Sequence, residues 1–307
     1  AREVLEQLRL GGHLKDARDF TKVIASFGRQ HAWEEALSVL HEMLSNDVAA
    51  DVVCLSAAAS ACERGRQWPR ALALLRGARA RHMLLNVIAY STAISACKKG
   101  EQWEYALELL AEMRHADIDP NVVCYSVGVS TCARSGQWQW ALEVLGEMLR
   151  SDIEANLITY NSVLSACEKG GQWRLALALL GSLQQAGPAP DVVSFSAAMS
   201  ACARAGDWRR GLALLAQMLE ERLEGDAISF NAAVSACEKG RQWQPALALL
   251  AAMRERGLGP NAVGYSAGIS ACEKCWQWER ALALHTEMRV ADCKSTVIRP
   301  AVQLAAA

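Results

Sequence analysis

The chain has 307 residues, of which 52% are hydrophobic, and its formal net charge is only −1 at pH 7. The hydrophobic content suffices to pack helices, whereas the near-neutral charge points to no nucleic-acid or membrane partner, so any such site must be local. Apolar runs such as Ala176–Leu180 are far shorter than the roughly 18 residues of a membrane span, and no transmembrane helix is expected.

One 35-residue unit recurs along the chain without insertion or deletion. Residues 1–15 are expected to be the second helix of a truncated repeat, and residues 296–307 to begin a degenerate or truncated ninth repeat. The eight full units between them span residues 16–50, 51–85, 86–120, 121–155, 156–190, 191–225, 226–260 and 261–295. A fixed period of this length is typical of a solenoid, and it favours one elongated array over two separate domains.

Each unit is predicted to be a pair of antiparallel helices joined by a tight turn, which makes the fold class all-α. In the fifth full unit, the apolar residues from Tyr160 to Cys167 recur at the i, i+3, i+4, i+7 spacing of a helix. Gly170 and Gly171 then interrupt the pattern, because glycine tolerates the left-handed backbone that ends a helix. A second apolar stripe begins at Trp173 and ends before Gly187.

Two apolar columns of the repeat are assigned to the core. A cysteine column lies in the first helices, with Phe27 in its place in the first unit: Cys62, Cys97, Cys132, Cys167, Cys202, Cys237 and Cys272. A tryptophan column opens the second helices: Trp33, Trp68, Trp103, Trp138, Trp173, Trp208, Trp243 and Trp278. An aromatic ladder could instead stack on bases, but apolar helical spacing favours packing. Buried cysteines act as small hydrophobes, so a reducing compartment without disulfides is expected.

Three polar columns are more restricted than packing requires. The reader column follows the aromatic of the first helix: Thr21, Ser56, Ser91, Ser126, Asn161, Ser196, Asn231 and Ser266. The opening column starts each following unit and contains only Asp or Asn: Asp51, Asn86, Asn121, Asn156, Asp191, Asp226 and Asn261. The basic column stands near the end of the first helices: Arg29, Arg64, Lys99, Arg134, Lys169, Arg204, Lys239 and Lys274.

Two of these columns also have a purely structural explanation. Asp and Asn satisfy the free N–H groups at the start of a helix, and Lys and Arg near a helix C-terminus suit the helix dipole. Capping alone would also admit Ser and Thr, which never occur in the opening column. Both explanations stay open, but neither accounts for the restriction of three columns together.

The repeat resembles the P-type 35-residue motif of pentatricopeptide repeat proteins. The resemblance covers residues 16–295 and rests on the [DN]-x-[VI]-x-[YF]-[NS] opening, the basic residue before the turn and the A-L-x-L-L second helix, although Leu55 replaces one aromatic. It implies a right-handed superhelical solenoid of about eight helix-turn-helix repeats. Such a solenoid binds single-stranded RNA with one base per repeat, N-terminus toward the 5′ end. It also implies a mitochondrial or chloroplast location, RNA-processing proteins as further partners, and no cofactor.

The resemblance gives each column a role. A reader residue and the opening residue of the next unit recognise one base together, and the basic column neutralises phosphates. Aliphatic residues near the start of each first helix hold the base from both sides: Val53, Ile88, Val123, Ile158, Val193, Ile228 and Val263. The family's pair preferences imply the RNA core 5′-GAAAUG(C/U)-3′. Ser266 pairs with Thr296, which departs from the pattern and leaves its base undetermined, and Arg18 puts the first unit's base pocket in doubt.

No catalytic constellation emerges from the sequence, and no membrane or small-molecule partner is expected. Cys272 and Cys275 with His285 and Cys293 could be combined into a zinc site, but Cys272 belongs to the cysteine column, so no metal is expected. The alternative function is a tetratricopeptide-like scaffold that holds a peptide in its concave groove. It would explain the neutral charge but not the restricted polar columns. An enzyme would require sequence beyond this chain.

Overall fold

The computed structural model describes residues 17–45, 48, 50–81 and 83–290, and all sixteen helices in this part of the chain are α-helices. They belong to two compact units, Ala1–Ala155 and Asn156–Ala307. The boundary between the units coincides with a predicted repeat boundary. The expected helix in residues 1–15 and the expected ninth repeat in residues 296–307 lie outside the described residues, as does Thr296.

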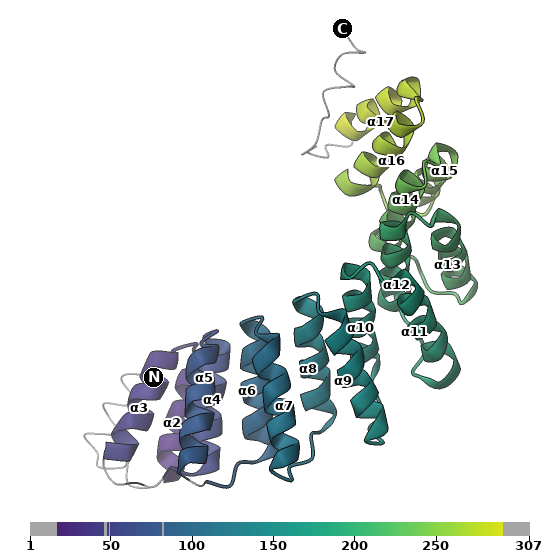
Figure 1. The fold of residues 1–307 in the computed structure, drawn as a ribbon. Helices are drawn as coiled ribbons and strands as arrows, with labels where there is room; N and C mark the ends of the chain where they lie inside the picture. Colours follow the sequence, from purple (N-terminus) through teal and green to yellow (C-terminus); the bar gives the residue numbers. More distant parts are fainter. Residues whose placement is uncertain (1–16, 46–47, 49, 82, 291–307) are drawn as a thin grey trace. The chain divides into compact units, whose positions relative to one another are not determined.

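The first unit consists of four helical hairpins, which stand side by side in Figure 1. Their first helices are α2 (Ala17–Arg29), α4 (Val52–Arg64), α6 (Val87–Lys99) and α8 (Val122–Arg134). Their second helices are α3 (Trp33–Ser45), α5 (Trp68–Ala80), α7 (Trp103–His115) and α9 (Trp138–Arg150). The predicted hairpin of each repeat is therefore confirmed, with the tryptophan column at the first residue of each second helix.

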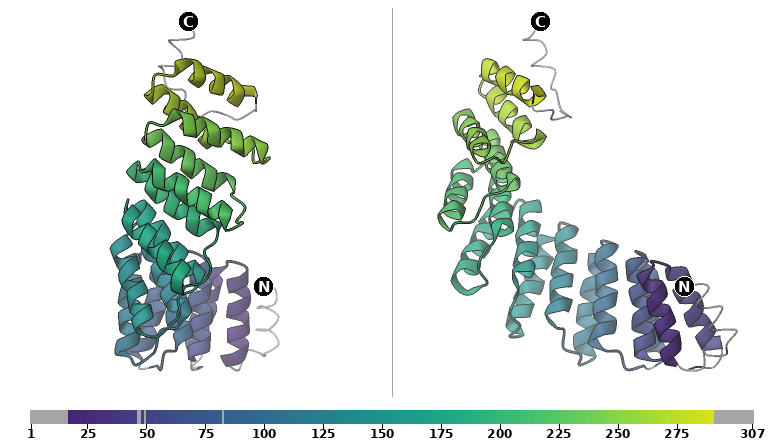
Figure 2. Two further views of the ribbon diagram at one scale, coloured as in Figure 1. Left: turned by 90° about the vertical axis from the view of Figure 1, so that its right-hand side faces the viewer. Right: turned by 180° about the vertical axis from the view of Figure 1, so that it is seen from behind.

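The second unit repeats this arrangement, and Figure 2 shows its helices from two further sides. Its first helices are α10 (Leu157–Lys169), α12 (Val192–Ala205), α14 (Ala227–Lys239) and α16 (Ala262–Lys274). Its second helices are α11 (Trp173–Ala186), α13 (Trp208–Glu220), α15 (Trp243–Glu255) and α17 (Trp278–Val290). Among the described residues, no helix combines the length and the apolar character needed to cross a membrane.

Within each unit, the first helices form a continuous layer, because α2 contacts α4, α4 contacts α6, and the same succession holds from α10 to α16. Within each unit, every second helix packs on its own first helix, and every second helix except the last also packs on the first helix of the next hairpin. Side chains of adjacent second helices also meet in places, as where the Trp68 and Tyr105 rings lie 5.4 Å apart. Each hairpin thus buries its apolar stripe against its neighbours in the unit.

The cysteine column lies in the core, as its spacing predicts. All seven of its members are fully buried, and so is Phe27, which occupies the same place in α2. Burial raises the pKa of these thiols from the ordinary value of 9.0 to about 11 in five of them and to about 12 in Cys97 and Cys132. The cysteines of the described part are free thiols, which act here as small apolar side chains.

The turn between the two helices differs in one respect from the prediction. Gly100 has φ −90° and Gly170 has φ −78°, both right-handed, whereas the left-handed residue is the next one, Glu101 or Gly171. The first glycine of the turn is explained by a contact instead. A Cβ on Gly100 would lie 2.2 Å from Cδ1 of Trp68 in the preceding hairpin. Trp68 therefore fills the space between hairpins, and glycine leaves room for its ring.

Candidate nucleic-acid interface

Seven aliphatic side chains of the first helices are exposed at equivalent positions. They are Val53, Ile88, Val123, Ile158, Val193, Ile228 and Val263, and between 55% and 69% of each is exposed. Each is the second residue of its helix and follows the opening residue by two positions. An exposed β-branched residue in seven consecutive repeats has no role in the core, so this row of side chains offers apolar surface to a ligand.

The opening column caps the first helices. Each of its seven side chains accepts a hydrogen bond from the backbone N–H three residues later, over distances from 2.7 Å at Asp51 to 3.1 Å at Asn261. Helix capping is therefore one role of the opening column, and the cap uses one oxygen of each side chain. The remaining atom is an acceptor oxygen in Asp and a donor NH₂ in Asn. Ser and Thr lack such a second polar atom.

The structure brings the reader and opening columns together in the second unit. Asn161 Nδ2 donates to the Asp191 carboxylate over 3.1 Å, and Asn231 Nδ2 donates to Asn261 Oδ1 over 3.0 Å. Each of these two pairs was assigned to one base from the sequence. In these two pairs, the two side chains therefore lie within hydrogen-bonding distance of each other.

Asp191 is held as an anion at neutral pH. Burial raises its pKa, but hydrogen bonds from the Ser194 backbone N–H and hydroxyl, and then from the Asn161 amide, outweigh it and lower the pKa overall. The pair of Asn161 and Asp191 therefore presents an amide and a charged carboxylate. The pair of Asn231 and Asn261 presents two neutral amides, so the two sites differ in charge as well as in hydrogen-bonding pattern.

The basic column lies near the C-terminal ends of the first helices, and four of its members pair with acidic residues of the preceding repeat. Lys99 lies 3.1 Å from Glu63, and Lys274 lies 2.9 Å from Glu238. Arg134 with Glu101 and Arg204 with Glu168 form two longer pairs, of 3.3 Å and 3.5 Å. Such exposed pairs contribute little to stability and exchange readily, so these cations can still meet phosphates, at the cost of releasing a carboxylate.

The tryptophan column contributes to packing between the helices of the described structure. Its members are half-buried, apart from the exposed Trp278, and several pack against the core, as Trp33, Trp173 and Trp208 do. Arginines lie over some of the rings, including Arg210 at 4.4 Å from the centre of the Trp173 ring. The predicted packing role of this column is thus supported by its contacts with the core.

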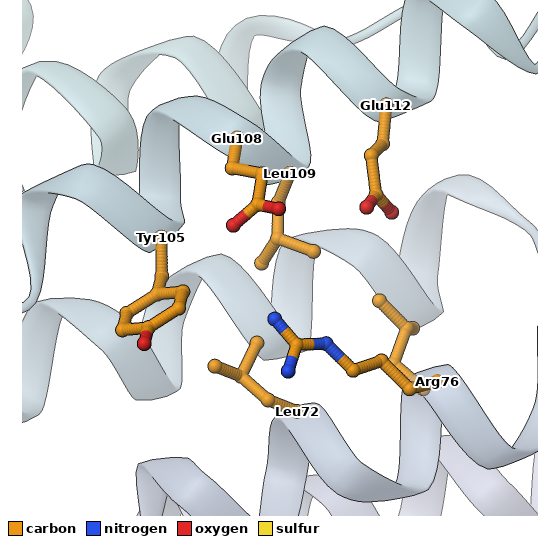
Figure 3. Close-up of a pocket in the computed structure, with 7 residues that line it drawn as sticks. Leu72, Arg76, Tyr105, Glu108, Leu109 and Glu112 are labelled. Carbon is orange, nitrogen blue, oxygen red and sulfur yellow. The ribbon is translucent and has the colours of Figure 1, made fainter.

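A small pocket lies on the layer of second helices, between α5 and α7. Figure 3 shows the Arg76 guanidinium reaching toward Tyr105 and Glu108, with Leu72 and Leu109 beside it. The Arg76 guanidinium carbon is 5.9 Å from the centre of the Tyr105 ring. None of the residues that line this pocket belongs to the reader, opening or basic column, so it is separate from the candidate interface.

The cysteines considered for zinc do not form a ligand cluster with described partners. Cys272 is fully buried in the core, and the Cys275 thiol donates to the Arg241 carbonyl at 3.1 Å. Cys293 lies outside the described residues. In the part of the chain that the structure covers, no group of three or more His, Cys, Asp or Glu side chains is placed to hold a metal ion.

One set of residues at the interface was missed by sequence reasoning. Ser194 and Ser229, which follow their opening residues by three positions, hydrogen-bond to reader residues of the preceding repeat. The residue type at this position varies from unit to unit, and the repeat pattern specifies no residue type there. A serine at the third helical position after Asp does suggest a capping box, which both of these helices have, but not a contact with another repeat.

Family models cover most of the chain with pentatricopeptide repeats. The model described as a pentatricopeptide repeat domain matches residues 143–205, 178–240 and 213–274. The model of the PPR repeat family matches residues 85–134, and the model of the PPR repeat matches residues 19–48, 123–153 and 265–293. Together these matches extend over residues 19–48 and 85–293, well over half of the chain.

Solved structures show the same fold. The crystal structure of the pentatricopeptide repeat protein PPR10 from maize matches with a TM-score of 0.62 and 20% identity, over 94% of this chain and 46% of that chain. PPR10 in complex with an 18-nt psaJ RNA element matches with a TM-score of 0.55 and 20% identity, over 92% of this chain and 46% of that one. The chain thus spans less than half the length of PPR10. A comparison with curated proteins found no match.

Proposed function

Because this chain belongs to the pentatricopeptide repeat family, we propose that it binds single-stranded RNA in a sequence-specific manner, with one base per repeat. The observation that carries the proposal is the row of seven exposed aliphatic side chains next to the hydrogen-bonded reader and opening residues. An apolar row suits the flat faces of bases, and paired polar groups beside it suit their edges.

The proposed role of each column follows from its chemistry. Aliphatic residues of consecutive repeats hold a base between them, the reader and opening residues bond to its edge, and the basic column contacts phosphates. A wrong base leaves a polar group of the pair without a partner, which costs about 1–3 kcal/mol. Because four of the cations pair with acidic neighbours and the net charge is near zero, the protein should bind nucleic acid weakly when the sequence does not match.

The family's pair preferences give the target 5′-GAAAUG(C/U)-3′, read from Thr21 with Asp51 at the 5′ end to Asn231 with Asn261 at the 3′ end. Serine paired with Asn accounts for the three adenines, and Asn161 with Asp191 for the uracil. We further propose that the protein is an adaptor, not an enzyme, that protects an organellar transcript, blocks its secondary structure or guides processing, editing or translation. The mitochondrial or chloroplast location belongs to this proposal.

The exchange Asn161→Ser tests the proposal directly. It would reproduce the pair of Ser196 with Asp226, which is assigned to G, beside the unchanged carboxylate of Asp191. We expect the preference at the fifth base to shift from U toward G by about 5- to 150-fold, the ratio that corresponds to the ~1–3 kcal/mol of one unpaired polar group. The sixth base, read by Ser196, serves as the internal control. A fifth-base preference that stays with U would show that the reader column does not select bases.

A further inference from the structure

A fourth position of the repeat lies beside the reader residues. It is the third residue of the first helices from α4 to α16, and we refer to it as the N3 column: Cys54, Ala89, Cys124, Thr159, Ser194, Ser229 and Gly264. In the second unit, the hydroxyl of Ser194 lies 2.6 Å from Asn161 Oδ1 and 2.9 Å from the Asp191 carboxylate, and shares its proton between these two acceptors. The N3 side chain thus contacts both residues that are proposed to recognise the fifth base.

The same reader residue bonds differently according to the N3 residue of the next repeat. Ser196, followed by Ser229, donates its proton to the Ser229 hydroxyl at 3.2 Å, and Ser229 in turn donates to the opening residue Asp226. Ser56 is followed by Ala89, which has no hydroxyl, and it donates to a backbone carbonyl of its own helix at 2.7 Å. A hydroxyl in the N3 column therefore redirects the reader from its own helix toward the opening residue.

Gly264 shows what the absence of an N3 side chain does. Asn231 is 9% exposed, and its Oδ1 is buried without a hydrogen-bond partner in the described structure. A Cβ on Gly264 would lie 2.5 Å from this oxygen, so the oxygen occupies the space that an N3 side chain would use. Asn231 thus lacks the hydrogen bond that Ser194 gives to Asn161.

A primary amide that is bonded on only one side can turn over, which exchanges its donor and acceptor. With Ser194 beside its oxygen, Asn161 is held in one orientation, with Nδ2 toward Asp191. Among the described residues, Asn231 is held by one bond only, from its Nδ2 to the capping oxygen of Asn261, and in the turned-over orientation its oxygen would accept from the Asn261 NH₂ instead. C and U differ in donor and acceptor along the edge that distinguishes them, so an amide that turns over accepts both.

We propose that the N3 column is a third specificity position, whose side chain does not touch the base but fixes the orientation of the preceding repeat's reader. The proposal rests on the proposed function of this site. Ser194 is a positioning residue that makes the fifth site selective for U. Gly264 leaves the seventh site tolerant of both C and U, which is the ambiguity that the pair of Asn231 and Asn261 carries.

Reciprocal exchanges test this inference. Gly264→Ser should turn the seventh site toward U, because a slight rotation of the Asn231 amide admits a hydroxyl that bonds its oxygen. The ratio of U to C affinity at that base should rise about tenfold, the factor that corresponds to ~1.4 kcal/mol. Ser194→Ala should lower the same ratio at the fifth base by a smaller factor, because the Asp191 carboxylate only accepts hydrogen bonds and still holds the Asn161 NH₂. Ser194→Thr should retain the wild-type ratio because it keeps the hydroxyl.

The measurement is fluorescence anisotropy with labelled GAAAUGC RNA and its C and U variants at the fifth and seventh bases, alongside thermal unfolding of each variant. A purely structural role would change affinity for all RNAs alike and leave the ratio of U to C affinity at each of the two bases unchanged. Unchanged ratios in Gly264→Ser and Ser194→Ala, or a shift toward C at the seventh base, would overturn the inference. If the wild-type protein itself shows no base preference, the proposed function fails instead.

Discussion

The substitution Ile88→Ser tests the apolar row of the interface without touching any group that forms a hydrogen bond through its side chain. Ile88 is 62% exposed at the start of α6, and Leu84, four residues earlier, is 90% exposed but belongs to none of the columns. Leu84→Ser, at the end of the preceding repeat and just before α6, is therefore a nearby control. Both are surface changes and should alter the free energy of unfolding by at most about 0.5 kcal/mol.

The expected loss of affinity follows from the exposed surface of Ile88. Complete burial of an isoleucine side chain is worth about 1.5–3 kcal/mol, so covering the exposed 62% with bases would contribute ~1–2 kcal/mol. The variant Ile88→Ser should bind GAAAUGC RNA about 5- to 30-fold more weakly than the wild type. Leu84→Ser should bind it with unchanged affinity.

Fluorescence anisotropy with labelled RNA measures both affinities, and circular dichroism during urea unfolding checks that both variants stay folded. Equal affinities of Ile88→Ser and the wild type would refute the assignment of this row to bases. Equal losses in Ile88→Ser and Leu84→Ser would do so too, since they would indicate a general effect of surface apolarity.

Three further predictions concern packing, ionisation and charge. Gly100→Ala should lower the free energy of unfolding by about 1–3 kcal/mol, because its methyl group would meet the Trp68 ring. Gly77→Ala, with open space around it in α5, should raise the free energy of unfolding by about 0.5–1 kcal/mol, and urea unfolding that finds both variants stabilised would contradict the contact of Gly100 with Trp68. The buried neutral thiols should contribute their full share to the free energy of unfolding below pH 9, and this contribution should be lost as the pH rises toward their folded-state pKa values of about 11 to 12, because the cysteines ionise first in the unfolded chain. In Cys97→Ala the loss, followed by urea unfolding across the pH range, should be smaller than in the wild type, and an equal loss would contradict the prediction. Lys239→Gln should weaken all RNAs alike and reduce the dependence of log affinity on log salt by ~0.7, and an unchanged slope would place this cation away from phosphates.

Local patterns predicted much of the fold. Helical spacing located both helices of each repeat, and the tryptophan column marks the first residue of every second helix from Trp33 to Trp278. The cysteine column proved fully buried, because a position that accepts either Cys or Phe27 is a packing position. These inferences depend on periodicity within one repeat, which the sequence shows eight times.

Contacts between repeats could not be predicted from the repeat pattern. The first turn glycine was assigned to left-handed backbone, but Gly100 has a negative φ and leaves room for Trp68, 32 positions earlier in the chain. The acidic partners of the basic column were missed for the same reason, as were the hydroxyls of the N3 column. A repeat pattern shows which residue types recur but not which of them meet across a stack, because that depends on how successive hairpins pack.

The candidate site was predicted as a set of columns, and the structure adds how they work together. The opening column both caps the helices and, at Asp191 and Asn261, bonds to the reader of the preceding repeat. Capping and base recognition had been competing explanations from the sequence. They are compatible, because an Asp or Asn side chain caps with one atom and keeps a second polar atom.

The most direct test of the central claim is the affinity of the protein for labelled GAAAUGC RNA compared with a scrambled RNA of the same composition, at two salt concentrations. Recognition of one base per repeat predicts tight binding of the ordered sequence and a preference over the scrambled RNA that persists at the higher salt, because hydrogen bonds and apolar contacts carry it. Equal affinities for the two RNAs, or binding that disappears at the higher salt, would contradict sequence-specific recognition.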